Sequence, residues 1–126
     1  MSLQCNNILL FVYNKEDLNM INIDTLNDVS TINAVSKMGI KPLDTVKHFK
    51  RELATENALL HEPNLYTYTI LAFAKDCDTL EDIVIYVARY NNPVSKVWVR
   101  KAKEFFAEVD HYKYPEVKQK YVYELI

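Results

Sequence analysis

The stretch Leu65–Tyr90, LYTYTILAFAKDCDTLEDIVIYVARY, holds the densest apolar and aromatic content of the chain. A short polar break, Lys75–Asp78, divides it into two halves. The first half leaves almost no polar face, which is typical of an element that is buried on all sides. The stretch therefore predicts a buried helical hairpin, and we expect the flanking segments to pack onto it.

Two local patterns bear on this hairpin. Thr79 and Asp82 form a pair of the capping-box type, and acidic residues cluster where the second helix would begin. Thr67 and Thr69, however, alternate with tyrosines, and threonine and tyrosine favour strands. A strand over residues 65–70 is therefore the competing prediction.

Length and composition favour one helical domain. The 126 residues are 49% hydrophobic and 25% charged, an ordinary globular balance, so we expect a single domain over residues 1–126. Gly39 is the only glycine, and glycine is the usual residue of tight β-turns. Its scarcity disfavours a sandwich or barrel, and it excludes a glycine-rich phosphate loop.

The fold class predicted from these patterns is mainly α, a compact bundle of about five helices. Gly39 is placed to end the first helix in a left-handed conformation. The run Ile8–Tyr13 is either a strand or a helical turn, so a short β-hairpin at the N-terminus is open. Alternation in Tyr121–Leu125 leaves open a two-stranded sheet between the chain ends. The helices are expected over roughly residues 25–38, 42–60, 65–75, 79–90 and 93–109. The last of these is expected to begin with Asn92 as its cap. Its buried stripe is expected to consist of Val94, Trp98, Ala102, Phe105 and Val109.

The most distinctive surface feature is a row of cations on the last predicted helix. Lys96, Arg100 and Lys103 fall at helical spacing on one face, where they could contact successive phosphates. The alternative is a solvated helix face, since acidic residues dilute the patch and the sequence pI is 5.9. The residues downstream that could add stacking and charge are Tyr112, Lys113, Tyr114, Lys118 and Tyr121.

The nine tyrosines are many for this length, and we do not expect all of them to be buried. Exposed tyrosines are favoured at protein interfaces, so the leading hypothesis is a small non-enzymatic protein that binds a protein partner or self-associates. Abundant asparagine and lysine indicate AT-rich codons, which fits a phage or viral accessory protein that inhibits a host factor. The alternative is a nucleic-acid-binding regulator, and the second alternative is an enzyme.

Catalytic and metal motifs are weak throughout. His48 and Glu52 lie one helical turn apart, but one such pair is not a zinc site. Cys5 and Cys77 have neither disulfide nor metal-ligand spacing and are expected to be reduced thiols. We predict no metal, no cofactor and no catalytic residues. With no signal peptide and no long apolar run, we expect a cytoplasmic protein without membrane contact.

Overall fold

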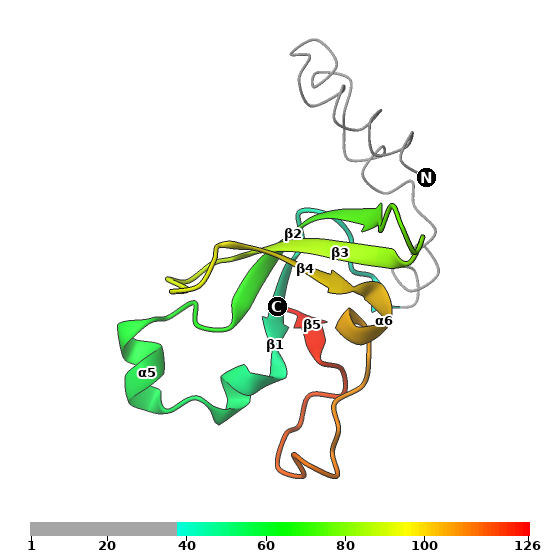
Figure 1. The fold of residues 1–126 in the computed structure, drawn as a ribbon. Helices are drawn as coiled ribbons and strands as arrows, with labels where there is room; N and C mark the ends of the chain where they lie inside the picture. The colour runs from blue at the N-terminus through cyan, green and yellow to red at the C-terminus, as the bar shows by residue number, and fades with distance from the viewer. Residues whose placement is uncertain (1–37) are drawn as a thin grey trace.

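The computed structural model describes residues 38–126, which build a five-stranded antiparallel sheet with short helical segments at its edges (Figure 1). The strand order is β4-β3-β2-β1-β5. The predicted helical bundle is therefore wrong. In chain order the elements are β1 (Thr45–His48), the 3-10 helix η1 (Phe49–Leu53), α5 (Glu56–His61), β2 (Thr67–Lys75), β3 (Asp82–Ala88), β4 (Val97–Lys101), α6 (Ala102–Phe105) and β5 (Tyr123–Leu125).

The central hairpin exists, but it consists of strands. β2 and β3 pair antiparallel along most of their length, in place of the helices predicted over residues 65–75 and 79–90. In β3 the side chains of Val84, Tyr86 and Ala88 are buried, and those between them are only partly buried. This period of two is that of a strand with one face in the core. The competing prediction of a strand in the first half is confirmed, and the strand continues to Lys75.

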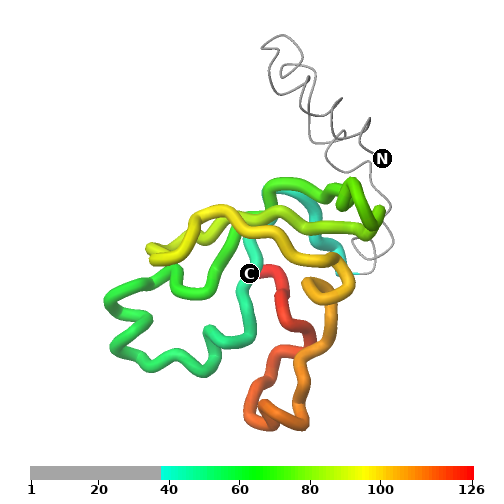
Figure 2. Tube along the Cα trace, in the orientation of Figure 1, coloured from blue at the N-terminus to red at the C-terminus, as the bar shows by residue number. Residues whose placement is uncertain are grey.

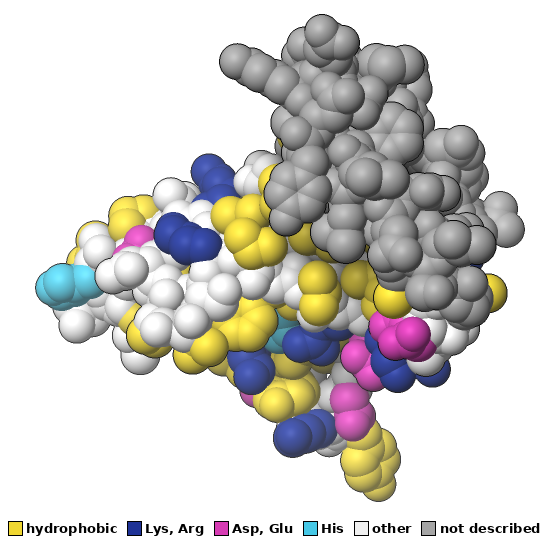
Figure 3. All heavy atoms as spheres, turned by 45° about the horizontal axis from the view of Figure 1, so that its top comes forward, with side chains coloured by type: hydrophobic (Ala, Val, Ile, Leu, Met, Phe, Trp, Pro, Cys, Tyr) yellow, Lys and Arg dark blue, Asp and Glu magenta, His cyan; other side chains and the backbone are white. Residues whose placement is uncertain are grey.

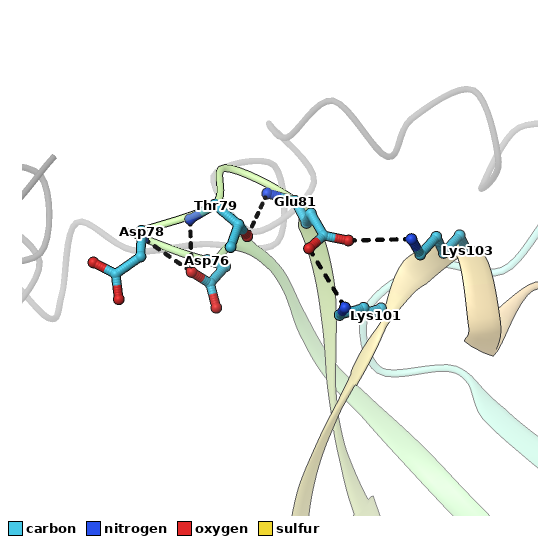
Figure 4. A network of polar contacts seen from close by, with 6 residues as sticks. All are labelled: Asp76, Asp78, Thr79, Glu81, Lys101 and Lys103. Carbon is cyan, nitrogen blue, oxygen red and sulfur yellow. Dashed lines mark hydrogen bonds and ion pairs between the residues drawn. The ribbon is translucent and has the colours of Figure 1, made fainter.

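The polar break between the two halves is the turn of this hairpin. Asp76 Oδ1 accepts hydrogen bonds from the backbone N–H groups of Asp78 at 2.9 Å and Thr79 at 3.0 Å (Figure 4). Thr79 Oγ1 accepts another from the backbone N–H of Glu81 at 3.2 Å. Such bonds from short polar side chains to the following backbone stabilise turns as well as helix starts. The predicted helix cap is therefore a turn.

The predictions of two further helices within the described residues, one on each side of the hairpin, are also wrong. β1, η1 and α5 occupy the range predicted as a helix over 42–60, and β4 and α6 occupy 93–109. Asn92, the expected helix cap, instead holds the β3–β4 turn, where its Oδ1 accepts from the backbone N–H of Val94 at 2.9 Å. Gly39 does adopt the left-handed conformation predicted for it, with φ of 72°.

The C-terminal tail ends in a strand. β5 pairs antiparallel with β1, so the end of the chain lies beside the first described strand (Figure 2). The alternation in Tyr121–Leu125 thus did indicate a strand. Its suggested partner, Ile8–Tyr13, lies outside the described residues, as does the predicted helix over 25–38 except for Met38. Within residues 38–126 every helix is too short or too polar to cross a bilayer.

The core lies on one face of the sheet and is unusually aromatic. Phe105 from α6 stacks on Tyr123 from β5 with ring centroids 3.9 Å apart and planes 3° from parallel. Tyr86 packs edge-on against both rings, at 5.2 and 5.8 Å. Beneath them Val46 and Ile70 are fully buried. α6 and β5, which are far apart in the sequence, are therefore held to the sheet by direct ring contacts.

A polar clamp fixes the loop between α6 and β5 to η1. The Glu52 carboxylate accepts hydrogen bonds from the backbone N–H groups of Lys118 at 3.0 Å and Gln119 at 2.8 Å. These bonds offset the desolvation that raises the pKa of Glu52, so that this pKa lies below its ordinary value. The Gln119 side chain is buried and donates to the carbonyl of Lys47 at 3.0 Å.

Replacing Glu52 by glutamine should weaken this clamp, because the amide is neutral and only one of its two terminal atoms accepts a hydrogen bond. We expect a loss of about 1 kcal/mol in the free energy of unfolding, because the carboxylate is exposed and water replaces part of each bond. Urea denaturation measures it. Glu116→Gln, the same change on an exposed residue of the same loop, is the control. Equal midpoints for the two variants would show that the clamp contributes nothing.

Candidate functional site

A hollow of about 200 Å³ opens on the sheet, and each of the five strands contributes at least one residue to its lining. We call it the aromatic hollow. Five aromatic side chains line it: Tyr66, Tyr68, Tyr86, Trp98 and Tyr123. The polar residues that line it are His48, Lys50, Asn92 and Arg100. Figure 3 shows one face of the molecule, on which Lys and Arg side chains lie among hydrophobic ones.

The strand register places the key residues together. Trp98 and Arg100 are two apart in β4 and therefore share one face, whereas on a helix they would lie on opposite sides. Tyr86 in β3 lies directly across from Trp98 in the register. The Tyr68 ring in β2 packs edge-on against Tyr86 with centroids 5.3 Å apart. The hollow thus has a floor of buried tyrosines and a rim that includes the exposed Arg100 and Lys50.

Arg100 interacts with the floor of the hollow. The hydroxyl of Tyr86 is the largest cause that raises the pKa of Arg100. Partial burial opposes the shift, and the carboxylate of Glu104 adds to it. A permanently charged fork of donors suits an anionic ligand group.

The tyrosine hydroxyls of the floor bond to one another. The hydroxyls of Tyr68 and Tyr90 are 2.9 Å apart, and Asn92 Nδ2 donates to that of Tyr90 at 3.2 Å. The Tyr123 hydroxyl approaches that of Tyr86 at 3.5 Å. Desolvation is the largest cause that raises the pKa values of Tyr68 and Tyr123 above their ordinary range. The hydroxyls of Tyr68 and Tyr123 therefore stay protonated and neutral, able to donate and accept hydrogen bonds.

His48 is neutral at physiological pH. The pKa of His48 is lowered to about 4, mainly by burial and in addition by the nearby charges of Lys50 and Arg100. Its Nδ1 accepts a hydrogen bond from the backbone N–H of Lys50 at 3.0 Å, which places the ring proton on Nε2. The ring also packs edge-on against Tyr123 with centroids 4.9 Å apart.

This low pKa predicts an acid-sensitive contribution to stability. His48 of the unfolded chain takes up a proton below its ordinary pKa of 6.5, whereas His48 of the folded protein does so only near 4. Its contribution is therefore complete above about pH 6.5 and declines as the pH falls towards 4. At about pH 5 the loss is at most about 2 kcal/mol, because the ring is partly accessible to water.

The measurement is urea denaturation at about pH 7 and about pH 5. His48→Asn keeps an acceptor for the Lys50 N–H without a titrating ring, so its unfolding midpoint should fall less than that of the wild type. His61→Asn, at an exposed position of α5, should behave like the wild type. If both variants lost stability in parallel with the wild type, His48 would not be the group responsible.

A second hollow of about 430 Å³ adjoins the first. Lys50 and Tyr66 line both, so they form the partition between them. The remaining described residues that line it are mostly apolar: Leu53, Ala54, Thr55, Ala58, Leu65 and Tyr114. Of the described residues that line either hollow, none is acidic. In a chain of net charge −2 this is a local bias towards positive charge.

The structure separates the three predicted cations. Arg100 lines the aromatic hollow. Lys96 lies at the start of β4 and its Nζ donates to the backbone carbonyl of Tyr90 at 3.0 Å. Lys103, in α6, is ion-paired with Glu81 at 3.5 Å at the far end of the β3–β4 pair (Figure 4). The single cationic helix face expected from their spacing is therefore wrong, because β4 is a strand.

The five downstream residues are also spread out. Tyr114 lines the second hollow and packs on Phe49 with centroids 4.9 Å apart. Tyr112 is fully exposed, and Lys113 lies over the Tyr114 ring at 5.4 Å. The backbone N–H of Lys118 is held by the Glu52 clamp, and Tyr121 is half-buried. Of the predicted site residues, Arg100 lines the aromatic hollow and Tyr114 lines the second hollow.

Most of the hollow escaped the sequence-based reasoning. Trp98 was assigned to a buried helical stripe, and Tyr86 was considered only as one of the nine tyrosines of the chain. The signal that would have found them is the alternation in Val97–Lys101 and Asp82–Ala88, which as strands turn Trp98, Arg100 and Tyr86 to one side. Within residues 38–126, no three His, Cys, Asp or Glu side chains gather closely enough to hold a metal ion.

A family model described as "Protein of unknown function (DUF1653)" matches residues 44–119, more than half of the chain. The chain belongs to this family. The DUF1653 match runs from just before β1 to beyond α6 and contains every residue that lines the aromatic hollow except Tyr123. No curated protein and no solved structure gives a significant match. The family description assigns no function to the hollow.

Proposed function

We propose that this protein is a non-enzymatic binding protein that holds a nucleotide unit in the aromatic hollow. One observation carries the proposal: aromatic rings and two cations, Lys50 and Arg100, share a concave surface whose described lining contains no carboxylate. A nucleotide unit combines a planar ring and a phosphate, and it matches both features.

The size and the surfaces of the hollow suit one base. Pockets for larger ligands measure about 300–1,000 Å³, so about 200 Å³ corresponds to a single ring system. Trp98 and Tyr66 are half-buried and therefore offer ring surface to a ligand. Stacking of a base on an aromatic side chain contributes about 1–3 kcal/mol. Arg100 at the rim supplies a bidentate donor for a phosphate.

The polar groups of the hollow are suited to binding more than to catalysis. His48 has its Nδ1 engaged and its pKa near 4, so it is a weak base at neutral pH. Tyr68 and Tyr123 have raised pKa values and retain their protons. General acid–base catalysis needs a group that titrates near the working pH. These three groups instead offer fixed neutral hydrogen-bonding atoms.

The tyrosine content, which led us to expect a protein partner, fits this proposal better. Four tyrosines line the aromatic hollow and Tyr114 lines the second hollow. Tyr90 is buried behind the first, bonded to Tyr68. Tyr112 is the fully exposed one among the described tyrosines. Most of the described tyrosines are thus used by the core and the two hollows, which leaves little to build a flat protein interface.

The test is fluorescence anisotropy with a short labelled single-stranded oligothymidylate or its RNA counterpart at low salt. We expect saturable binding that weakens as salt is added, because phosphate contacts release counterions. Competition by free thymidine monophosphate separates the two sources of the ligand: strong competition indicates a free nucleotide, and weak competition indicates a strand. Lack of binding to both the strands and the nucleotide would overturn the proposal, as would capture of a protein partner through these same residues.

A further inference from the structure

We infer that the two hollows are consecutive subsites for a single strand, each accepting one base, with Lys50 between them to hold the intervening phosphate. This inference depends on the proposed function and names its ligand class more closely. It starts from the shared lining: Lys50 and Tyr66 belong to both hollows, whereas Arg100 belongs to the first alone. The first hollow thus has two cations, and it shares one of them with the second hollow.

The partition between the subsites is built rigidly. Tyr66 has φ of 60°, a left-handed conformation that is rare for a bulky residue and is kept only where its surroundings enforce it. The backbone N–H of His48 donates to the Tyr66 carbonyl at 2.9 Å. Arg51 donates to the carbonyls of Leu65 at 2.7 Å and Pro63 at 3.0 Å. These bonds hold the backbone that carries Tyr66, and its ring packs edge-on against Tyr90 with centroids 5.9 Å apart. A preorganised wall loses little entropy when a ligand binds.

At about 430 Å³ the second subsite has room for a base together with its sugar, and it has the chemistry to receive them. Leu53, Ala58 and Leu65 give it apolar walls. The ring of Tyr114 is supported from behind by Phe49, with the two planes tilted by 55°. Lys50 is the cation among its described lining residues, so this subsite gains affinity mainly by apolar contact and stacking. It complements the first subsite, which has both rings and the Arg100 charge.

Competition against the labelled strand by thymidine mono-, di- and trinucleotides tests the two-subsite arrangement. We expect the dinucleotide to bind roughly tenfold or more tightly than the mononucleotide, because it adds one stacked base and one phosphate contact. The step from dinucleotide to trinucleotide should add much less. Equal affinities for mono- and dinucleotide would overturn the inference and leave the proposed function standing. Failure of all three to compete, with no binding of the strand, would remove the proposed function itself.

A matched pair of variants locates the second base. Leu53→Glu puts a carboxylate into the second hollow at a position that is already 41% exposed, so the fold should tolerate it. We expect it to bring the dinucleotide affinity down to that of the mononucleotide. Leu60→Glu makes the same change at a 78% exposed position of α5 and should keep the wild-type preference. If both variants kept the wild-type preference for the dinucleotide over the mononucleotide, the second base would lie elsewhere and the inference would fail.

Discussion

Replacing Arg100 by glutamine is expected to lower the affinity for a single-stranded oligonucleotide by about 10- to 100-fold. Glutamine keeps a polar side chain of similar reach but removes the charge and the forked donors. Arg100 is exposed at the rim of the aromatic hollow and interacts with the Tyr86 hydroxyl, so its replacement removes a phosphate contact. Arg100→Lys restores the charge without the fork and should recover part of the affinity.

Anisotropy titrations at several salt concentrations measure this effect. The slope of log affinity against log salt should decrease in size by about one for Arg100→Gln, as expected for one lost phosphate contact. Lys103→Gln removes the same charge from an exposed residue that lines neither hollow and lies at the far end of the β3–β4 pair, and it serves as the control. Circular dichroism confirms that both variants are folded. Equal affinities for the two would contradict the placement of the ligand.

Replacing Phe105 by alanine should cost about 3–5 kcal/mol of the free energy of unfolding. The ring is completely buried, stacks on Tyr123 at 3.9 Å and contacts Tyr86 at 5.2 Å, so its removal leaves a cavity between α6, β3 and β5. Because domains of this size are stable by about 5–15 kcal/mol, much of the folded population would be lost. Urea denaturation followed by circular dichroism measures the change.

Phe106→Ala is the matched control for this prediction. Phe106 is the next residue and also packs on Phe105, at 5.2 Å, but its side chain is only partly buried. We expect a loss of about half that of Phe105→Ala or less, because less apolar area leaves water in the native state. Equal and small losses for both variants would show that the stacked pair of Phe105 and Tyr123 does not hold the C-terminal strand to the sheet.

Several buried positions were predictable although the secondary structure was not. Ala102, Phe105 and Val109 were expected in the core and are buried. Val94, from the same predicted stripe, is 79% exposed, because the chain there forms the β3–β4 turn. A short apolar stripe identifies residues that avoid water, but it does not by itself distinguish a helix from a strand that leads into one helical turn.

The central hairpin was mistaken for helices for two physical reasons. The register shifts between Ile70 and Ala72, and this irregularity places the buried Ile70 and Phe73 three apart, as on a helix. Glycine is scarce, yet the turns form without it: Leu80 adopts φ of 62°, and Asp76 and Asn92 hold backbone N–H groups with their side chains. Side-chain hydrogen bonds thus stabilise these turns in the absence of the glycine that a hairpin turn usually contains.

The aromatic hollow could not be assembled from the sequence for a related reason. Its lining comes from positions as far apart as His48 and Tyr123, which the antiparallel pairing of β1 with β5 makes neighbours. Arg100 was recognised as a candidate contact from its charge. Its partner Trp98 was not, because the spacing of two that unites them has meaning only once β4 is known to be a strand.

The emission of Trp98 during titration with unlabelled oligothymidylate tests the central claim most directly. Trp98 is the one tryptophan of the chain, and it lines the aromatic hollow with its indole N–H donating to the Ser95 carbonyl at 3.1 Å. A base stacked in the hollow should quench this emission saturably, at the same concentrations that saturate the anisotropy signal. Saturable binding by anisotropy with unchanged Trp98 emission would place the ligand elsewhere and contradict the account.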